Sequence, residues 1–103
     1  MIPTVNVTVA VHGQDGTPVR DALVFARLTT VERYNGYVVA GEYEGRTDER
    51  GRAVVAVFPN ELGSEGSEYR FKIVTSAGRT FSVYATVPNS DCNLHQICEL
   101  EPS

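Results

Sequence analysis

This chain has little positive charge and few of the residues that usually mark a chemical site. Its 103 residues contain no tryptophan, two histidines, two cysteines and a single lysine, Lys72. Nine basic residues stand against thirteen acidic ones, and the net charge of −4 has the wrong sign for a surface that tracks nucleic-acid phosphates. One lysine also leaves no polybasic patch for a membrane surface. We therefore expect no nucleic-acid partner and no membrane partner.

Long apolar runs are missing too, and none approaches the roughly 18 residues that a membrane-spanning helix needs. Residues 1–4 show no charged and then apolar leader, so we expect no signal peptide and synthesis in the cytoplasm. What is present is ordinary for a folded protein, with 42% hydrophobic and 21% charged residues. A chain of this length has room for one domain with one modest core.

Apolar and polar residues alternate along most of the chain, which is the pattern of half-buried β-strands. In the first strand Val5, Val7 and Val9 share one face. The sequence therefore predicts an all-β fold, a single antiparallel β-sandwich of about seven strands over residues 1–88, followed by a short C-terminal tail over residues 89–103. The clearest strand segments are residues 5–11, 21–34, 52–58, 69–75 and 79–87.

Asn35-Gly36 is the strongest hairpin signal in the chain, because both residues tolerate the positive φ angles of a tight two-residue turn. Such a turn sets the register of the strands on either side of it. The two tyrosines at the tip have two readings: they cover a small apolar cluster of the protein itself, or they contact a partner. The pairs that this register predicts are Tyr34 with Tyr37, Leu28 with Tyr43 and Arg27 with Glu44.

The tail over residues 89–103 breaks the strand pattern. Leu94, Ile97 and Leu100 recur at threefold spacing, which predicts one apolar stripe on a short helix capped by Ser90 or Asp91. So short a helix is not stable alone in water and must dock on something. We expect the tail to be the main attachment element, with Leu94 and Ile97 as its apolar anchors on a neighbouring protein. The alternative is that it packs across an open end of its own sandwich.

Cys92, His95 and Cys98 are residue types that bind zinc. Their spacing spreads them around a helix, however, and the chain has one other histidine as a fourth ligand, so we expect no metal site. A Cys92–Cys98 disulfide requires a loop and an oxidising compartment. The third interpretation, two small buried hydrophobic residues, fits a cytoplasmic chain best.

No arrangement of catalytic residue types is recognisable. Asp48 with Glu49, and Glu42 with Glu44, fit a polar turn and an exposed strand face better than a cleft. The glycines fall at turns and not in a phosphate-binding order. We therefore expect no enzyme and no cofactor. Serines without the G-x-S-x-G surroundings of a nucleophile are Ser64, Ser67, Ser76 and Ser82.

Two turn segments carry a family resemblance. Residues 15–26 contain G-x-P-V-x-x-A-x-V and residues 47–53 contain T-D-x-x-G-x-A, and each leads into an apolar run. This pair of patterns resembles the transthyretin-like, or carboxypeptidase-regulatory-like, β-sandwich modules. The chain is also similar to Ig-like modules of tailed-bacteriophage virion proteins, in which a Val-Pro exit such as Val87-Pro88 precedes a segment like residues 93–97.

The resemblance implies a non-enzymatic structural component of a bacteriophage virion, as a head-decoration, neck or tail-fibre connector subunit. It further implies other virion proteins as partners and repeated copies in a symmetric assembly. The alternative is a stand-alone adhesive or carbohydrate-binding module, although aromatic residues that stack sugars are scarce. A hydroxyisourate-hydrolase-type enzyme shares the architecture, but its catalytic residues and its C-terminal Y-R-G-S are missing here. The expected partner-binding residues are Leu94, Ile97, Leu100, Tyr34 and Tyr37.

Overall fold

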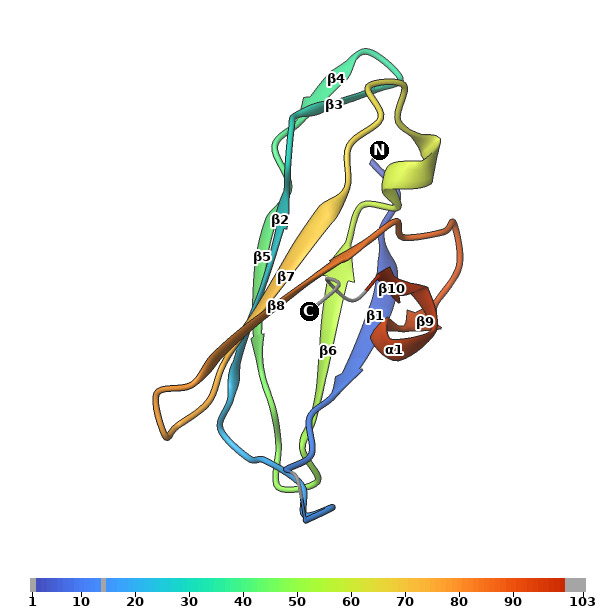
Figure 1. The fold of residues 1–103 in the computed structure, drawn as a ribbon. Helices are drawn as coiled ribbons and strands as arrows, with labels where there is room; N and C mark the ends of the chain where they lie inside the picture. The colour runs from blue at the N-terminus through green and yellow to red at the C-terminus, as the bar shows by residue number, and fades with distance from the viewer. Residues whose placement is uncertain (1, 14, 100–103) are drawn as a thin grey trace.

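The computed structural model describes residues 2–13 and 15–99 of the chain. Its elements are almost entirely β-strands, which confirms the all-β prediction (Figure 1). Within these described residues, helix is confined to a three-residue 3-10 turn, η1, and the four-residue α1. In the described residues the bounds are β1 Val5–Ala10, β2 Leu23–Leu28, β3 Glu32–Tyr34, β4 Tyr37–Val39, β5 Glu42–Arg46, β6 Arg52–Val57, η1 Asn60–Leu62, β7 Tyr69–Val74, β8 Thr80–Ala85, β9 Cys92–Asn93, α1 Leu94–Ile97 and β10 Cys98–Glu99.

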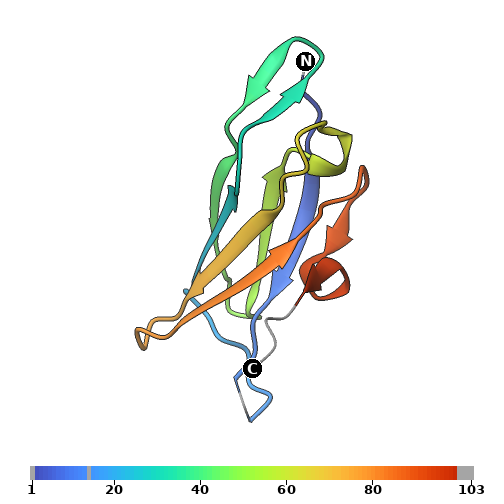
Figure 2. The ribbon, with the colours of Figure 1, turned by 45° about the horizontal axis from the view of Figure 1, so that its top comes forward.

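The strands form one sheet in the order β6-β1-β9, a second in the order β10-β8-β7-β2-β5, and the separate hairpin β3-β4. All neighbours are antiparallel except β9, which runs parallel to β1 over two residues. The strand count exceeds the expected seven for three reasons: the long second strand divides at residues 29–31, the strand returning from the hairpin divides at residues 40–41 into β4 and β5, and the tail adds β9 and β10. The hairpin extends beyond the ends of both sheets (Figure 2).

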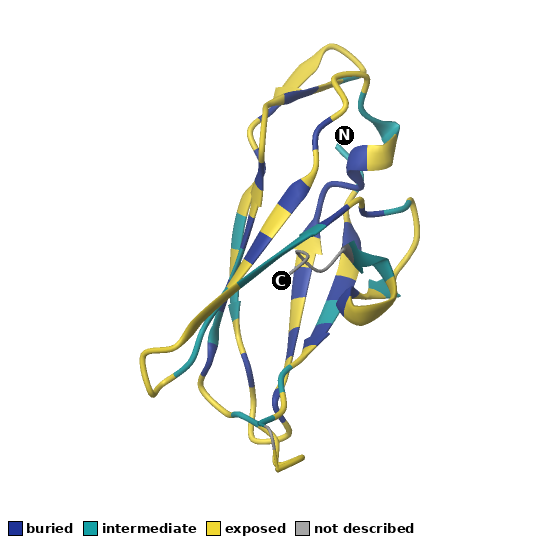
Figure 3. Cartoon of the chain, viewed as in Figure 1, coloured by how far each residue is buried: buried dark blue, intermediate teal, exposed yellow. Residues whose placement is uncertain are grey.

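One hydrophobic core lies between the two larger sheets (Figure 3). Alternation in β1 buries Val5, Val7 and Val9, and β6 buries the residues that face them. From the other sheet, Val24 of β2 and Phe71 of β7 are fully buried. Burying each valine fully is worth about 1.5–3 kcal/mol, so this alternation is the main local cause of the fold.

The predicted hairpin tip is confirmed. Asn35 has a φ of 47° and Gly36 a φ of 84°, the two positive angles of a type I′ turn. Tyr34 pairs with Tyr37 in the expected register. The conformational preferences of Asn35 and Gly36 were therefore sufficient to predict the turn and the Tyr34–Tyr37 pair.

The register predicted further from the tip is wrong. Arg27 pairs with Glu42, at 3.2 Å between Nε and Oε1, and not with Glu44, and the backbone N–H of Leu28 donates to Gly41 and not to Tyr43. Residues 29–31 lie opposite the single residue 40, so the strand slips by two. We attribute this slip to a long-range contact. The backbone N–H of residue 29 donates to the carbonyl of residue 68, which directly precedes β7, so residue 29 follows β7 and not the hairpin.

Replacing Gly36 with valine should lower the free energy of unfolding by about 1–2 kcal/mol, because a β-branched residue resists a positive φ. Open space surrounds the position where a Cβ would lie, so backbone strain is the only cost. Gly36→Asn is the matched control, since asparagine tolerates this conformation. Thermal melting should separate the two variants, and equal melting temperatures would contradict the tight turn.

The two turn segments of the family resemblance meet in the structure. The buried hydroxyl of Thr47 donates to the carbonyl of Val19 and accepts from the backbone N–H of Ala22, both at 2.8 Å. Asp48 accepts from the backbone N–H groups of Arg52 and Arg50, which hold the pKa of its carboxyl below the usual range. Asp48 therefore closes a turn, as expected, and its carboxylate is engaged with backbone.

Candidate functional site

The two tyrosines of the hairpin tip have different surroundings. Tyr34 is half-buried, and its ring packs edge-on against Phe58 with 5.5 Å between ring centroids. Tyr37 is 50% exposed. The two readings of this pair thus divide between its members: Tyr34 covers the protein's own core, and Tyr37 is available to a partner.

Residues 29–40 form an arm, and this arm carries most of the exposed large apolar side chains among the described residues. Val38 is 72% exposed, and Val31 and Tyr37 are 50% exposed. Arg33 pairs with Val38 across the hairpin, so a charged neighbour lies beside the most exposed valine. The hairpin of the arm lies beyond the ends of both sheets, where these three side chains are exposed (Figures 1 and 3).

The arm is held in place by a buried carboxylate that the sequence analysis missed. Glu32 is fully buried, its Oε1 accepts the backbone N–H of Glu65 at 2.9 Å, and its Oε2 accepts that of Ser67 at 3.0 Å. The Ser67 hydroxyl also donates to Oε2. Burial by itself would raise the pKa of Glu32, but the hydrogen bonds from Ser67 and Glu65 outweigh it and hold that pKa below its usual range.

This carboxylate begins a chain of buried polar contacts. Asn60 donates from Nδ2 to the carbonyl of Ser67 and accepts the backbone N–H of Val87, both at 2.7 Å. The contacts link the arm, the loop over residues 63–67 and the segment that follows β8. The sequence did contain a sign of this buried carboxylate. Glu32 lies two residues before Tyr34, so in a strand both side chains point to the same, inward face. The arm is thereby preorganised, which lowers the ordering cost of any contact that it makes.

The tail returns to the protein's own sheets. Leu94 is 5% exposed and belongs to the core, and Ile97 packs against it half-buried. Asp91 does not cap α1; its Oδ1 accepts the backbone N–H of Asn6, and the helix begins later, after Asn93, without a side-chain cap. The structure therefore uses Leu94 and Ile97 within the chain, while Leu100 lies outside the described residues. That the tail also contacts a partner stays a prediction.

Cys92 and Cys98 are free thiols in the structure, half-buried against the core on strands of different sheets. Burial raises the pKa of the Cys92 thiol, which disfavours the reactive thiolate. His95 between them is exposed. Over residues 2–13 and 15–99 no group of three or more histidine, cysteine, aspartate or glutamate residues is placed to hold a metal ion. These positions fit the reading of two small hydrophobic residues.

The hydroxyl groups of Ser64, Ser67 and Tyr69 each donate a hydrogen bond to another group of the protein. Ser67 donates to Glu32 in a buried contact, and Ser64 donates to the adjacent Glu65 at 2.9 Å on the surface. Tyr69, also buried, donates its hydroxyl to the carbonyl of Phe58 at 2.8 Å, and burial raises its pKa above the usual range. The buried hydrogen bonds of Glu32, Asn60 and Ser67 can therefore hold the arm in place, because each of these donors and acceptors is paired with another group of the protein.

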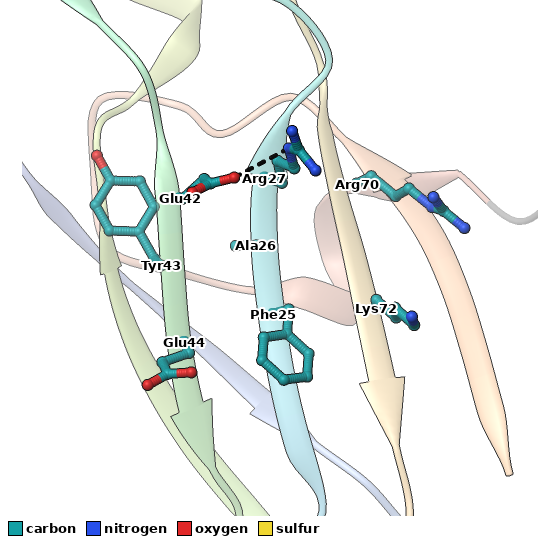
Figure 4. Close-up of a pocket in the computed structure, with 8 residues that line it drawn as sticks. All are labelled: Phe25, Ala26, Arg27, Glu42, Tyr43, Glu44, Arg70 and Lys72. Carbon is teal, nitrogen blue, oxygen red and sulfur yellow. Dashed lines mark ion pairs between the residues drawn. The ribbon is translucent and has the colours of Figure 1, made fainter.

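An open groove of about 640 Å³ lies on the outer face of the β10-β8-β7-β2-β5 sheet (Figure 4). Carboxylates of β5 line one side and basic side chains of β2 and β7 the other, with an aromatic ring between them. The exposed acidic pair predicted on a strand face is part of this groove. Its main lining residues are Phe25, Arg27, Glu42, Glu44, Arg70 and Lys72.

None of the helices in the described part of the chain has both the length and the apolar character needed to cross a membrane. Comparison with known proteins gives no family: no protein-family model matches the sequence, and no curated protein matches it. The family resemblance accordingly rests on the turn segments and the Val-Pro exit alone.

Proposed function

We propose that this protein is a non-enzymatic structural component of a tailed-bacteriophage virion, a head-decoration, neck or tail-fibre connector subunit that acts through protein-protein contacts. Its fold would be a transthyretin-like or Ig-like β-sandwich. Two sheets that share one core, and the hydrogen bonds by which Thr47 of the second turn segment contacts the first, support this architecture. The partners would be other virion proteins, contacted by repeated copies of this chain.

The observation that carries the proposal is the rigid apolar arm. It exposes Tyr37 and Val38, and the buried Glu32 anchors the arm to the backbone of residues 65 and 67. Burying the exposed parts of these two side chains, 50% of Tyr37 and 72% of Val38, contributes about 2–4 kcal/mol before ordering costs. That is a modest contact for one copy, but it becomes sufficient where every subunit of a symmetric assembly repeats it.

Replacing Val38 with aspartate should prevent the protein from joining virions, because a charge would have to be buried in the contact. Val54→Asp is the matched control: Val54 is also an exposed strand valine, 59% exposed, but lies on β6. Both variants should melt close to the unaltered protein. The measurement is quantitative mass spectrometry of particles banded in a density gradient after infection of cells.

The unaltered chain should band with the particles at a fixed ratio to the major head protein. A chain that stays at the top of the gradient contradicts the virion proposal. A Val38→Asp variant that still bands normally leaves a virion role in place but moves the contact away from the arm. Binding to glycans as a monomer, without particle association, would favour the adhesive alternative.

A further inference from the structure

The outer face of the large sheet is laid out in rows set by the strand register. Arg27 of β2 lies directly between Glu42 of β5 and Arg70 of β7, and in the next row Phe25 lies between Glu44 and Lys72. The rows extend to Tyr84 and Ser82 of β8, and a third row contains Arg46, Leu23, Val74 and Thr80.

Charge is separated across this face. β5 carries the acidic strip, Glu42 and Glu44, and β7 carries the basic strip, Arg70 and Lys72, all exposed (Figure 4). Within the described residues the ion pair on this face joins Arg27 to Glu42, and none involves Glu44, Arg70 or Lys72. Arg27 and Arg70 are direct cross-strand neighbours of like charge, which disfavours the isolated sheet. Within the described residues of one copy, Glu44, Arg70 and Lys72 on this face therefore form no ion pair.

We propose that this face pairs with the same face of a second copy of the chain, about a two-fold axis parallel to β2. Such an axis places β5 of each copy over β7 of the other and keeps the rows aligned. Glu42 then meets Arg70 of the other copy, and Glu44 meets Lys72. Two β2 residues meet their own equivalents at the axis: Phe25, where two aromatic rings can stack, and Arg27, whose charge is offset by Glu42 of its own copy. The acidic and basic strips are thus self-complementary, as a closed two-fold contact requires, and their four opposite-charge contacts outnumber the one like-charge contact of Arg27 with its equivalent.

A second copy fits this face better than other occupants. A nucleic acid would meet the acidic strip, and an acidic or basic peptide would match one strip and be repelled by the other. Strands spaced about 4.8 Å apart and rows about 6.8 Å apart give roughly 300–400 Å² per copy. That is below the size of a standard stable interface, so the pairing should be weak, salt-dependent and effective chiefly among repeated copies. The inference rests on the proposed structural function for its biological use, but not for its test.

The test exchanges the charges of each strip. Glu42→Lys with Glu44→Lys makes both strips basic, and Arg70→Glu with Lys72→Glu makes both acidic. Each double variant alone should self-associate at least about tenfold more weakly than the unaltered chain, whereas an equimolar mixture of the two should recover association. Sedimentation equilibrium at low salt, up to about 1 mM protein, covers the range of a weak contact. Raising the salt to about 1 M should weaken the association of the unaltered chain.

The matched control is Glu49→Lys with Glu61→Lys, the same change of net charge at exposed positions away from the sheet face, which should leave association unchanged. An unaltered chain that is monomeric throughout, a mixture that fails to associate, or a control that weakens as much as the Glu42 and Glu44 variant would each overturn the inference. The outcome is independent of the Val38→Asp experiment, so failure here and failure of the virion proposal are distinguishable.

Discussion

Replacing Glu32 with alanine should lower the free energy of unfolding by about 3–5 kcal/mol. The backbone N–H groups of Glu65 and Ser67 and the Ser67 hydroxyl would lose their common acceptor where water does not reach Glu32. Each buried donor left without a partner costs about 1–3 kcal/mol, and the missing side chain leaves a cavity as well. Urea denaturation followed by circular dichroism measures the change. A loss below about 1 kcal/mol would show that the loop rearranges to satisfy its donors elsewhere.

Glu32→Gln is the matched control for charge, because it keeps the shape and one acceptor oxygen. It should cost less than the alanine variant. The pH dependence separates the two effects: the pKa of Glu32 is lower in the folded protein than in the unfolded chain, so its contribution is complete above the unfolded pKa of about 4.3 and is lost as the pH falls through the folded value. The stability gap between the unaltered chain and Glu32→Gln should therefore narrow on acidification below about pH 4. A constant gap would mean that the carboxylate charge contributes nothing.

Replacing Leu94 with alanine should lower the free energy of unfolding by about 2–5 kcal/mol, the usual range for a buried leucine. Leu94 is 5% exposed in the core, although it lies in the segment over residues 89–103 that we expected to attach to a partner. His95→Ala is the matched control, since the exposed neighbour should change stability by less than about 0.5 kcal/mol. Thermal and urea unfolding of the two variants measure the difference.

Truncation after Asn89 should have a larger effect still, because it removes Leu94, the Asp91 bond to Asn6 and strands β9 and β10 together. We expect such a chain to lose its cooperative transition. A truncated chain that melts cooperatively near the full-length temperature, with Leu94→Ala equally stable, would instead show that the tail is dispensable to the core. The tail would then be free to serve as an attachment element.

The sequence alone determined the features that depend on near neighbours. Alternating valines in residues 5–9 assigned the buried face of β1, because strand side chains point to opposite sides in turn. Asn35-Gly36 determined the turn and the Tyr34–Tyr37 pair, because few residues accept two successive positive φ angles. Asp48 was recognised as a turn acceptor for the same local reason.

Only the tertiary structure decided the features that depend on distant partners. The slip at residues 29–31 follows from a backbone bond to residue 68, and Glu32 becomes a buried anchor only because residues 65 and 67 offer donors there. The tail docks on its own chain because β1 and β8 leave edges that β9 and β10 can pair with. The charged strips of β5 and β7 face one groove because β2 lies between them. The alternation of apolar residues indicates which side of a strand is buried, and turn residues indicate where a strand ends, but neither indicates which strand lies beside it. The slip, the Glu32 anchor, the docking of the tail and the two charged strips all depend on which strands are neighbours.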